Sequence, residues 1–269
     1  MRHPGTRVAG AAQICGQLRS RPGQTGAVTP DPIARLTAEL DRRLADLPRA
    51  EAHRAPFLAT YRRTTAAVGA AVERGFFEDA AWVRRWTEVF GRYYLDAHDA
   101  ALAGSAVARP WRLAFTLATD AHPLAHLLLG MNAHINYDLP QAMLDVISSA
   151  DFDDETLLAS RVRDHDRIDE ILAGRVAAED AELGGARRLV DRVLTPANRL
   201  SSRRFLAESR AKVWENVLAL QEARRAGAYA DRLAELEVLA AAKVMDLLRP
   251  GHVLLRLAVA GFGVRLPPP

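Results

Sequence analysis

Four side chains that can hold hydrogen bonds or metal ions recur along one stretch of the sequence, at His122, His126, His134 and Asp138. On an α-helix each step of four residues advances about 40° around the axis, so these positions share one slowly drifting face. Imidazole nitrogens and a carboxylate oxygen at this spacing can approach one ion. Because Pro123 disfavours α conformation at the residue before it, we expect the helix to begin there and His122 to fall outside it. The predicted metal ligands of this stretch are therefore His126, His134 and Asp138.

The helix that carries these residues is apolar on most sides, which favours burial. Buried imidazoles, carboxylates and amides require partners, because an unpaired polar group away from water costs free energy. Gly130 fills the gap in the series of fours and removes a side chain where a substrate or a neighbouring helix needs room. Asn132 and Asn136 lie off this face and can donate hydrogen bonds to the ligands or to a neighbouring helix. A metal-free network of hydrogen bonds between the same groups is the alternative interpretation.

Side chains in other segments could complete a site. Tyr61, with Asn132 and Asn136, is a candidate catalytic residue, and so is Arg210, which could hold a buried carboxylate. The candidate carboxylate ligands outside the central stretch are Asp96, Asp154 and Glu208. Each has an ordinary alternative role: an aromatic core for the tyrosine, a helix cap for Asp154, and solvated or ion-paired surfaces for the others.

The elements that must position these residues are helices. Hydrophobic residues make up 49% of the chain and charged residues 26%, and β-branched runs are scarce. Apolar residues recur at helical spacing along most of the chain, so we predict the all-α class and a single bundle of many helices. Asp31 and Asp79 are the expected N-terminal caps of two helices, Gly75 ends another, and a break is expected near Gly227.

The composition divides the chain and excludes several classes of protein. We expect a mobile, disordered N-terminal tail at residues 1–30, a helical domain at 31–249, and a short terminal helix with a proline-rich tail at 250–269. Cys15 is the only cysteine, which excludes disulfide frameworks and thiolate zinc sites and fits a cytoplasmic protein. The net charge is +3 with acidic and basic residues interspersed, so we expect no nucleic-acid partner. No apolar run reaches the roughly 18 residues of a membrane span.

The central stretch resembles the hallmark of a bacterial family catalogued as a domain of unknown function. That hallmark has the form H-L-L-L-G-M-N-A-H-I-N-x-D-L, and it matches His126 to Leu139. Weaker similarities lie in the segments around Tyr61 and Trp214, so that the resemblance spans about residues 35–220. The resemblance implies a helical fold and a shared site at His126, Asn132, His134, Asn136 and Asp138, without implying an activity.

Three functions fit these residues. The first is a metal-dependent enzyme, a non-haem di-iron oxygenase that hydroxylates an apolar small molecule and draws on an electron-transfer partner. The second is a zinc or two-metal hydrolase of ester or phosphate bonds, in which a metal-bound water attacks. The third is a metal-free binding or scaffold protein with a buried His/Asn/Asp network. The sequence departs from the signatures of both enzyme classes: it has no Glu-x-x-His pair and no histidine-rich start to its first helix.

Overall fold

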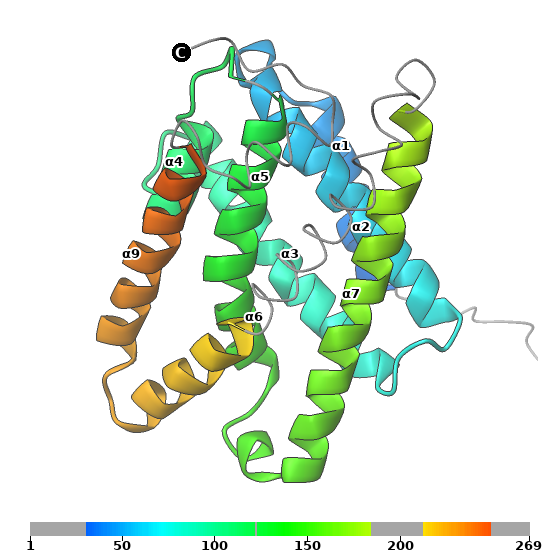
Figure 1. Ribbon diagram of the computed structural model, residues 1–269, viewed down its shortest axis with the longest axis vertical. Helices are drawn as coiled ribbons and strands as arrows, with labels where there is room; N and C mark the ends of the chain where they lie inside the picture. The colour runs from blue at the N-terminus through cyan, green and yellow to red at the C-terminus, as the bar shows by residue number, and fades with distance from the viewer. Residues whose placement is uncertain (1–30, 122, 184–211, 249–269) are drawn as a thin grey trace, which may run out of the picture. The chain divides into compact units, whose positions relative to one another are not determined.

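The computed structural model describes residues 31–121, 123–183 and 212–248 (Figure 1). These residues form helices joined by short turns, and no β-strand occurs among them. The all-α helical bundle predicted from the sequence is therefore confirmed. Within the same residues, no helix is both long enough and apolar enough to span a bilayer. The predicted tail at 1–30 and the predicted terminal helix at 250–269 lie outside the described residues.

The starts of α1 and α3 and the end of α2 lie where the capping residues predict. Helix α1 (Pro32–Ala45) starts after Asp31, whose Oδ1 accepts hydrogen bonds from the backbone N–H groups of Ile33 and Ala34. A short 3-10 helix, η1 (Arg49–Arg54), leads into α2 (Ala55–Glu73). Gly75 follows α2 with φ of 70°, a left-handed conformation that costs glycine no strain. The side chain of Asp79 caps α3 (Ala80–Leu102) by accepting from Trp82 N.

The remaining helices complete the bundle. Their bounds are α4 (Arg109–Phe115), α5 (Pro123–Ala133), η2 (His134–Asp138), α6 (Leu139–Val146), η3 (Asp151–Asp153), α7 (Glu155–Leu183) and α9 (Tyr229–Leu248), with residues 212–225 helical before α9. The break before α9 falls at Gly227, whose φ is 73°, as the sequence predicts. Helix α5 begins at Pro123, as the sequence predicts, and His122 lies outside the described residues.

The hallmark stretch is not one uninterrupted α-helix. Residues His134–Asp138 form a π-helix, in which the N–H of Leu139 donates to the carbonyl oxygen of His134 five residues earlier. Single π-turns within α-helices are rare, and they occur frequently at functional sites. The spacing of the hallmark residues had predicted regular α-helix through Asp138. The wider turn was not predictable, because no residue type specifies a π-turn as proline or glycine specifies a break.

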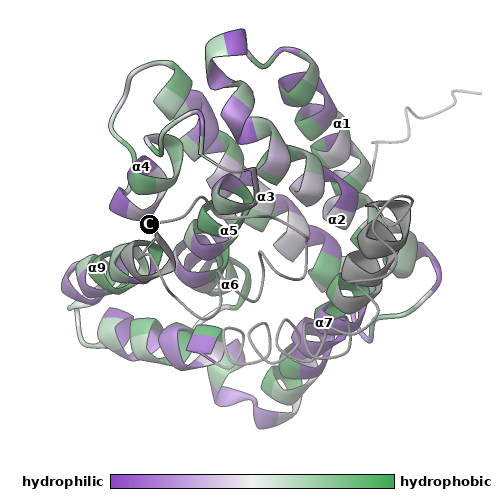
Figure 2. Cartoon of the chain, turned by 45° about the horizontal axis from the view of Figure 1, so that its top comes forward, coloured by the Kyte–Doolittle hydropathy of each residue, from purple (hydrophilic) through white to green (hydrophobic). Residues whose placement is uncertain are grey.

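Helix α5 lies against α2, α4 and α9, so most of its surface is covered by other helices (Figure 1). Gly130 permits the closest of these approaches, since a Cβ atom there would lie 2.6 Å from Cγ of Phe57 on α2. The room left by Gly130 is therefore filled by a neighbouring helix, one of the two roles expected of it. In Figure 2 most helices carry both hydrophilic and hydrophobic residues, as expected of helices with one buried face.

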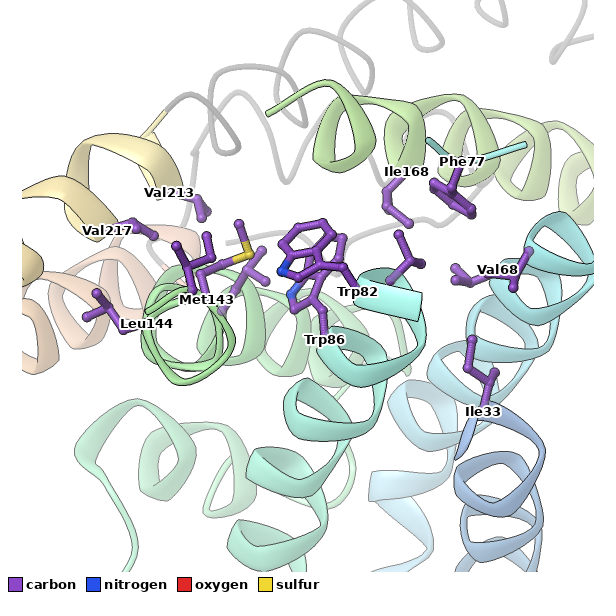
Figure 3. Close-up of a cluster of buried hydrophobic side chains, with 14 of the residues drawn as sticks. Ile33, Val68, Phe77, Trp82, Trp86, Met143, Leu144, Ile168, Val213 and Val217 are labelled. Atoms are coloured by element: carbon purple, nitrogen blue, oxygen red, sulfur yellow. The ribbon is translucent and has the colours of Figure 1, made fainter. Parts of the chain in front are cut away.

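Two clusters of buried apolar side chains hold the helices together. The first includes the stacked rings of Trp82 and Trp86, 5.1 Å apart, together with residues of α6, α7 and the helical residues 212–225 (Figure 3). The second is built around Phe57, Tyr94 and Trp111 and includes residues of α1, α2, α3, α4, α5 and α9. The half-buried ring of Phe90 packs against both clusters. The second cluster encloses the polar end of the hallmark stretch.

Candidate functional site

The buried pair His134–Asp138 forms the centre of the candidate site. His134 Nδ1 lies 2.9 Å from Asp138 Oδ2, and both side chains are almost completely buried. The same oxygen accepts a second hydrogen bond of 2.9 Å from the indole N–H of Trp111, on α4. The three side chains thus form a connected triad, Trp111–Asp138–His134, in which one carboxylate oxygen holds two ring nitrogens.

This arrangement fixes which nitrogen of His134 is available for chemistry. Since a carboxylate oxygen only accepts hydrogen bonds, Nδ1 of a neutral His134 carries the proton and Nε2 carries the lone pair. Burial lowers the pKa of His134 and raises that of Asp138, because both charges lose their hydration, while their mutual hydrogen bond opposes each shift. Nε2 of His134 is buried and has no hydrogen-bond partner among the described residues. Asp138 therefore fixes the orientation of the His134 ring, and the lone pair of Nε2 has no partner among the described residues.

Aromatic rings surround the imidazole of His134. The ring of Phe90 stacks on it, with centroids 3.7 Å apart and an angle of 5° between the planes. Tyr61 approaches edge-on at 4.6 Å. The other rings within 6.0 Å are those of Phe57, Tyr94 and Trp111. We call these five rings the aromatic shell. It removes water from His134, so that any charge or ligand at Nε2 interacts in a medium of low polarity.

The predicted site residues separate into those that meet at His134 and those that do not. Tyr61 joins the shell, and the pairing of His134 with Asp138 agrees with their spacing. Asn132 instead donates to the carbonyl oxygen of Ala240 on α9, and Asn136 donates to the side-chain oxygen of Asn132. Asn132 thus ties α5 to α9, which was one of the two roles expected for these amides, and Asn136 holds the Asn132 side chain in place.

His126 points away from the triad. Its ring lies 5.0 Å from that of His53 on η1. His126 and His134 are eight positions apart, so the second side chain is rotated by about 80° from the first, which is enough to direct the two imidazoles toward different neighbours. Side chains four positions apart differ by only about 40° around the axis, whereas side chains eight positions apart no longer share one face.

The candidate carboxylates outside the hallmark do not reach the triad either. Asp96 is exposed on α3, and the Asp154 side chain caps α7 by accepting from Leu157 N at 2.9 Å. Glu208 and Arg210 lie outside the described residues. No group of three or more His, Cys, Asp or Glu side chains placed to hold a metal ion occurs in the described ranges.

A comparison with models of known protein families matches residues 33–250 to a family of unknown function, DUF5995. The chain belongs to this family. The matched segment runs from the start of α1 past the end of α9, so the triad, the aromatic shell and the bundle that holds them are parts of the DUF5995 domain. Searches among curated proteins and among solved structures found no match.

Sequence reasoning missed four of the five rings around His134 in this DUF5995 site: Phe57, Phe90, Tyr94 and Trp111. Trp111 is the most consequential of them, because it also donates to Asp138. Trp111 is 27 residues from Asp138 in sequence, so only the packing of α4 on α5 brings its indole N–H to the carboxylate. A signal was nevertheless present: a buried tryptophan usually needs an acceptor, and Asp138 is the acidic residue of the hallmark.

His98 lies next to the aromatic shell, where its ring packs beside Tyr94 and is only 1% exposed. Its pKa therefore offers a test of how burial in this region affects a titratable group. Burial, together with the nearby charge of Arg54, lowers the pKa of His98 to about 4. Between this value and the ordinary pKa of about 6.5, the unfolded chain binds a proton that the folded chain does not. The free energy of unfolding should therefore fall as the pH is lowered through this range, by up to about 1.4 kcal/mol per unit from this residue.

The measurement is urea unfolding of the wild type and His98→Gln at a series of pH values between about 7 and 4. The variant should lose the part of the slope that His98 contributes. Equal slopes for the two proteins would show that His98 takes up its proton as readily in the folded state as in the unfolded state.

Proposed function

We propose that this protein is an iron-dependent oxidoreductase that acts on an apolar small molecule, with His134 as the protein ligand of the iron. The observation that supports it is the buried lone pair at His134 Nε2, which has no partner among the described residues, opposite an Nδ1 held by Asp138. Histidines that bind metals almost always donate their other ring N–H to a carboxylate, a carbonyl or water. The orphaned atom and its anchored partner fit such a ligand.

Asp138 and Trp111 act through His134 in this proposal. The carboxylate keeps the imidazole in the tautomer with a free Nε2 and makes that nitrogen more basic. Trp111 fixes the carboxylate oxygen by its own hydrogen bond. Both are positioning residues, because neither would touch the iron. When bound, the iron would supply the activation of oxygen that hydroxylation of an unreactive substrate needs.

The single free imidazole nitrogen at His134 favours a form of iron that requires only one side chain of the protein as a ligand. A single imidazole suffices where a macrocycle fills the other equatorial positions, as in haem proteins. A bare ion or an iron pair would require further side chains, and no group of three or more His, Cys, Asp or Glu side chains placed to hold a metal occurs in the described ranges. The di-iron oxygenase expected from the sequence would thus depend on residues such as Glu208, which lies outside these ranges.

The aromatic shell supports an apolar substrate. Four of its five rings are buried, whereas Phe90 is partly exposed and lies over one face of His134. Phe90 is therefore the ring whose movement would admit a cofactor or a substrate to His134. Apolar walls with a few directed polar groups are typical of sites for small apolar molecules. An oxygenase of this kind would also require an electron-transfer partner.

The test is the metal content and absorption spectrum of the protein, purified without a histidine tag from cells supplied with iron. We expect iron in the wild type and its loss in His134→Ala. In His126→Ala, a matched variant of a buried histidine that does not reach the triad, the iron should remain. An absorption band near that of haem would identify macrocyclic iron, and iron without such a band would favour the non-haem form.

Other outcomes favour the remaining functions. Bound zinc that depends on His134 would support a metal-dependent hydrolase. The absence of any metal from the wild type, with the unfolding transition unchanged by a chelator, would contradict both enzymes. In that case the triad would be a metal-free structural network.

A further inference from the structure

A second group of buried polar side chains lies where η1 meets α3 and α4. At its centre is Arg54, whose side chain is 8% exposed. Arg54 Nε lies 2.7 Å from Oε2 of Glu51, and the guanidinium carbon lies 4.3 Å above the ring of Phe115. Nη1 of Arg54 is buried and has no hydrogen-bond partner among the described residues. One edge of the guanidinium is thus paired with a carboxylate, and another donor is left without an acceptor.

Two neighbouring side chains show the same deficit. The rings of Tyr94 and His98, both on α3, lie 5.6 Å apart, and the ring of His98 lies 6.4 Å from that of Phe115. Tyr94 is completely buried and His98 almost so. The Tyr94 hydroxyl and His98 Nδ1 have no partner within the part of the chain that the structure describes. The charge of Arg54 lowers the pKa of His98 and opposes the rise that burial causes in the pKa of Tyr94, so it lies within electrostatic reach of both.

A second imidazole, that of His53, faces the same region. His53 Nε2 lies 3.3 Å from the carbonyl oxygen of Phe115, and His53 Nδ1 is buried without a partner among the described residues. Native proteins leave few buried polar groups unsatisfied, and each such group calls for a water, an ion or a functional role. Here four side chains with such atoms are linked by contacts, because His53, Arg54 and His98 each approach Phe115, and Tyr94 lies beside His98.

We infer that Arg54, with Tyr94 and His98, binds a small oxyanion, the carboxylate or phosphate group of a ligand. The guanidinium presents parallel N–H donors that match the two oxygens of such a group. The Tyr94 hydroxyl and one imidazole N–H of His98 are further donors for its remaining lone pairs. Glu51, on the Nε side of Arg54, holds the guanidinium in place without occupying Nη1. This oxyanion site does not depend on the proposed iron at His134.

Tyr94 connects this oxyanion site with the aromatic shell. Its ring lies 5.6 Å from that of His98 and 6.0 Å from that of His134. A ligand with a carboxylate at Arg54 and an apolar body would therefore be anchored next to the aromatic residues of the shell. The chemical class that the two sites suit together is an apolar monocarboxylic acid.

Calorimetric titration of the metal-free protein with acetate and with inorganic phosphate, at constant ionic strength, tests the inference. We expect saturable binding of one anion per chain, weakened at least tenfold in Arg54→Gln. Tyr94→Phe removes only the hydroxyl and keeps the ring, so it tests the site even if Arg54→Gln fails to fold. Binding in Tyr94→Phe should be several-fold weaker than in the wild type. Tighter binding of acetate would identify a carboxylate ligand, and tighter binding of phosphate a phosphorylated one.

The matched control is Arg62→Gln, since Arg62 pairs with the exposed Asp41 and lies outside the cluster. Its binding of either anion should equal that of the wild type. The inference would be overturned if neither anion bound saturably to the wild type, or if Arg62→Gln weakened binding as much as Arg54→Gln. Because the titration uses protein without metal, its failure leaves the iron at His134 to be judged separately.

Discussion

Replacing Asp138 with alanine should lower the free energy of unfolding by about 3–5 kcal/mol, since each buried donor that loses its acceptor costs about 1–3 kcal/mol. The loss has three sources. His134 Nδ1 and the Trp111 indole N–H would each lose their acceptor while remaining buried, and the missing carboxyl would leave a cavity. Urea unfolding followed by the helical circular dichroism signal measures the change.

Asp96→Ala is the matched control, because it removes a carboxylate that is exposed on the same bundle. Its unfolding free energy should stay within about 0.5 kcal/mol of the wild type, as for most surface changes. Asp138→Asn should give an intermediate value, since its amide oxygen can accept both hydrogen bonds but lacks the charge that strengthens them. Equal stabilities of Asp138→Ala and Asp96→Ala would contradict a structural role for the triad.

Replacing Asp164 with alanine should cost a comparable amount, about 2–4 kcal/mol. Asp164 lies on α7 and is fully buried, yet its two oxygens accept hydrogen bonds of 2.8 Å from the backbone N–H groups of Glu78 and Asp79. Arg167 Nη1 donates to the same carboxylate at 2.8 Å. The side chain therefore fastens α7 to the turn before α3, and its loss leaves two backbone donors and one guanidinium without their acceptor.

Thermal and urea unfolding of Asp164→Ala, compared with Glu170→Ala, measure this effect. Glu170 is an exposed acid on the same helix, so its replacement should change stability by no more than about 0.5 kcal/mol. Hydrogen exchange adds a local test, because the amides of Glu78 and Asp79 should exchange faster in Asp164→Ala. Unchanged exchange at these two amides would show that they have other acceptors.

The helices were predictable where local chemistry specifies a boundary. Asp31 and Asp79 cap helices by hydrogen bonds to residues two or three positions away, and Gly75 and Gly227 adopt conformations that few other residues tolerate. Such interactions involve residues only a few positions apart, so a short stretch of sequence is enough to predict them. The all-α class follows from the same periodicity. The way the helices pack was not predictable, because contacts between segments far apart leave no comparable local signal.

The same distinction applies to the candidate site. The pairing of His134 with Asp138 could be predicted, because four residues of helix bring their side chains together. Trp111 could not be assigned to it, since its hydrogen bond to Asp138 depends on tertiary packing. His126 does not join the site, because eight positions of helix separate it from His134 and turn its side chain toward His53. Asp154 does not join because its side chain caps α7, where it accepts a hydrogen bond from Leu157 N.

The π-helix at His134–Asp138 contains one residue more than an α-helical turn that follows the same path. Deleting a single residue here would restore α-helical hydrogen bonding and leave α6 in nearly the same orientation relative to α5, because the wider turn absorbs the extra residue. The apolar face of α6, which includes the buried Met143 and Leu144, would stay toward the core. The deletion would instead change the spacing of His134 and Asp138 from four residues to three. A DUF5995 sequence with one residue fewer between these positions should therefore keep the packing of α6 and differ at the His134–Asp138 pair.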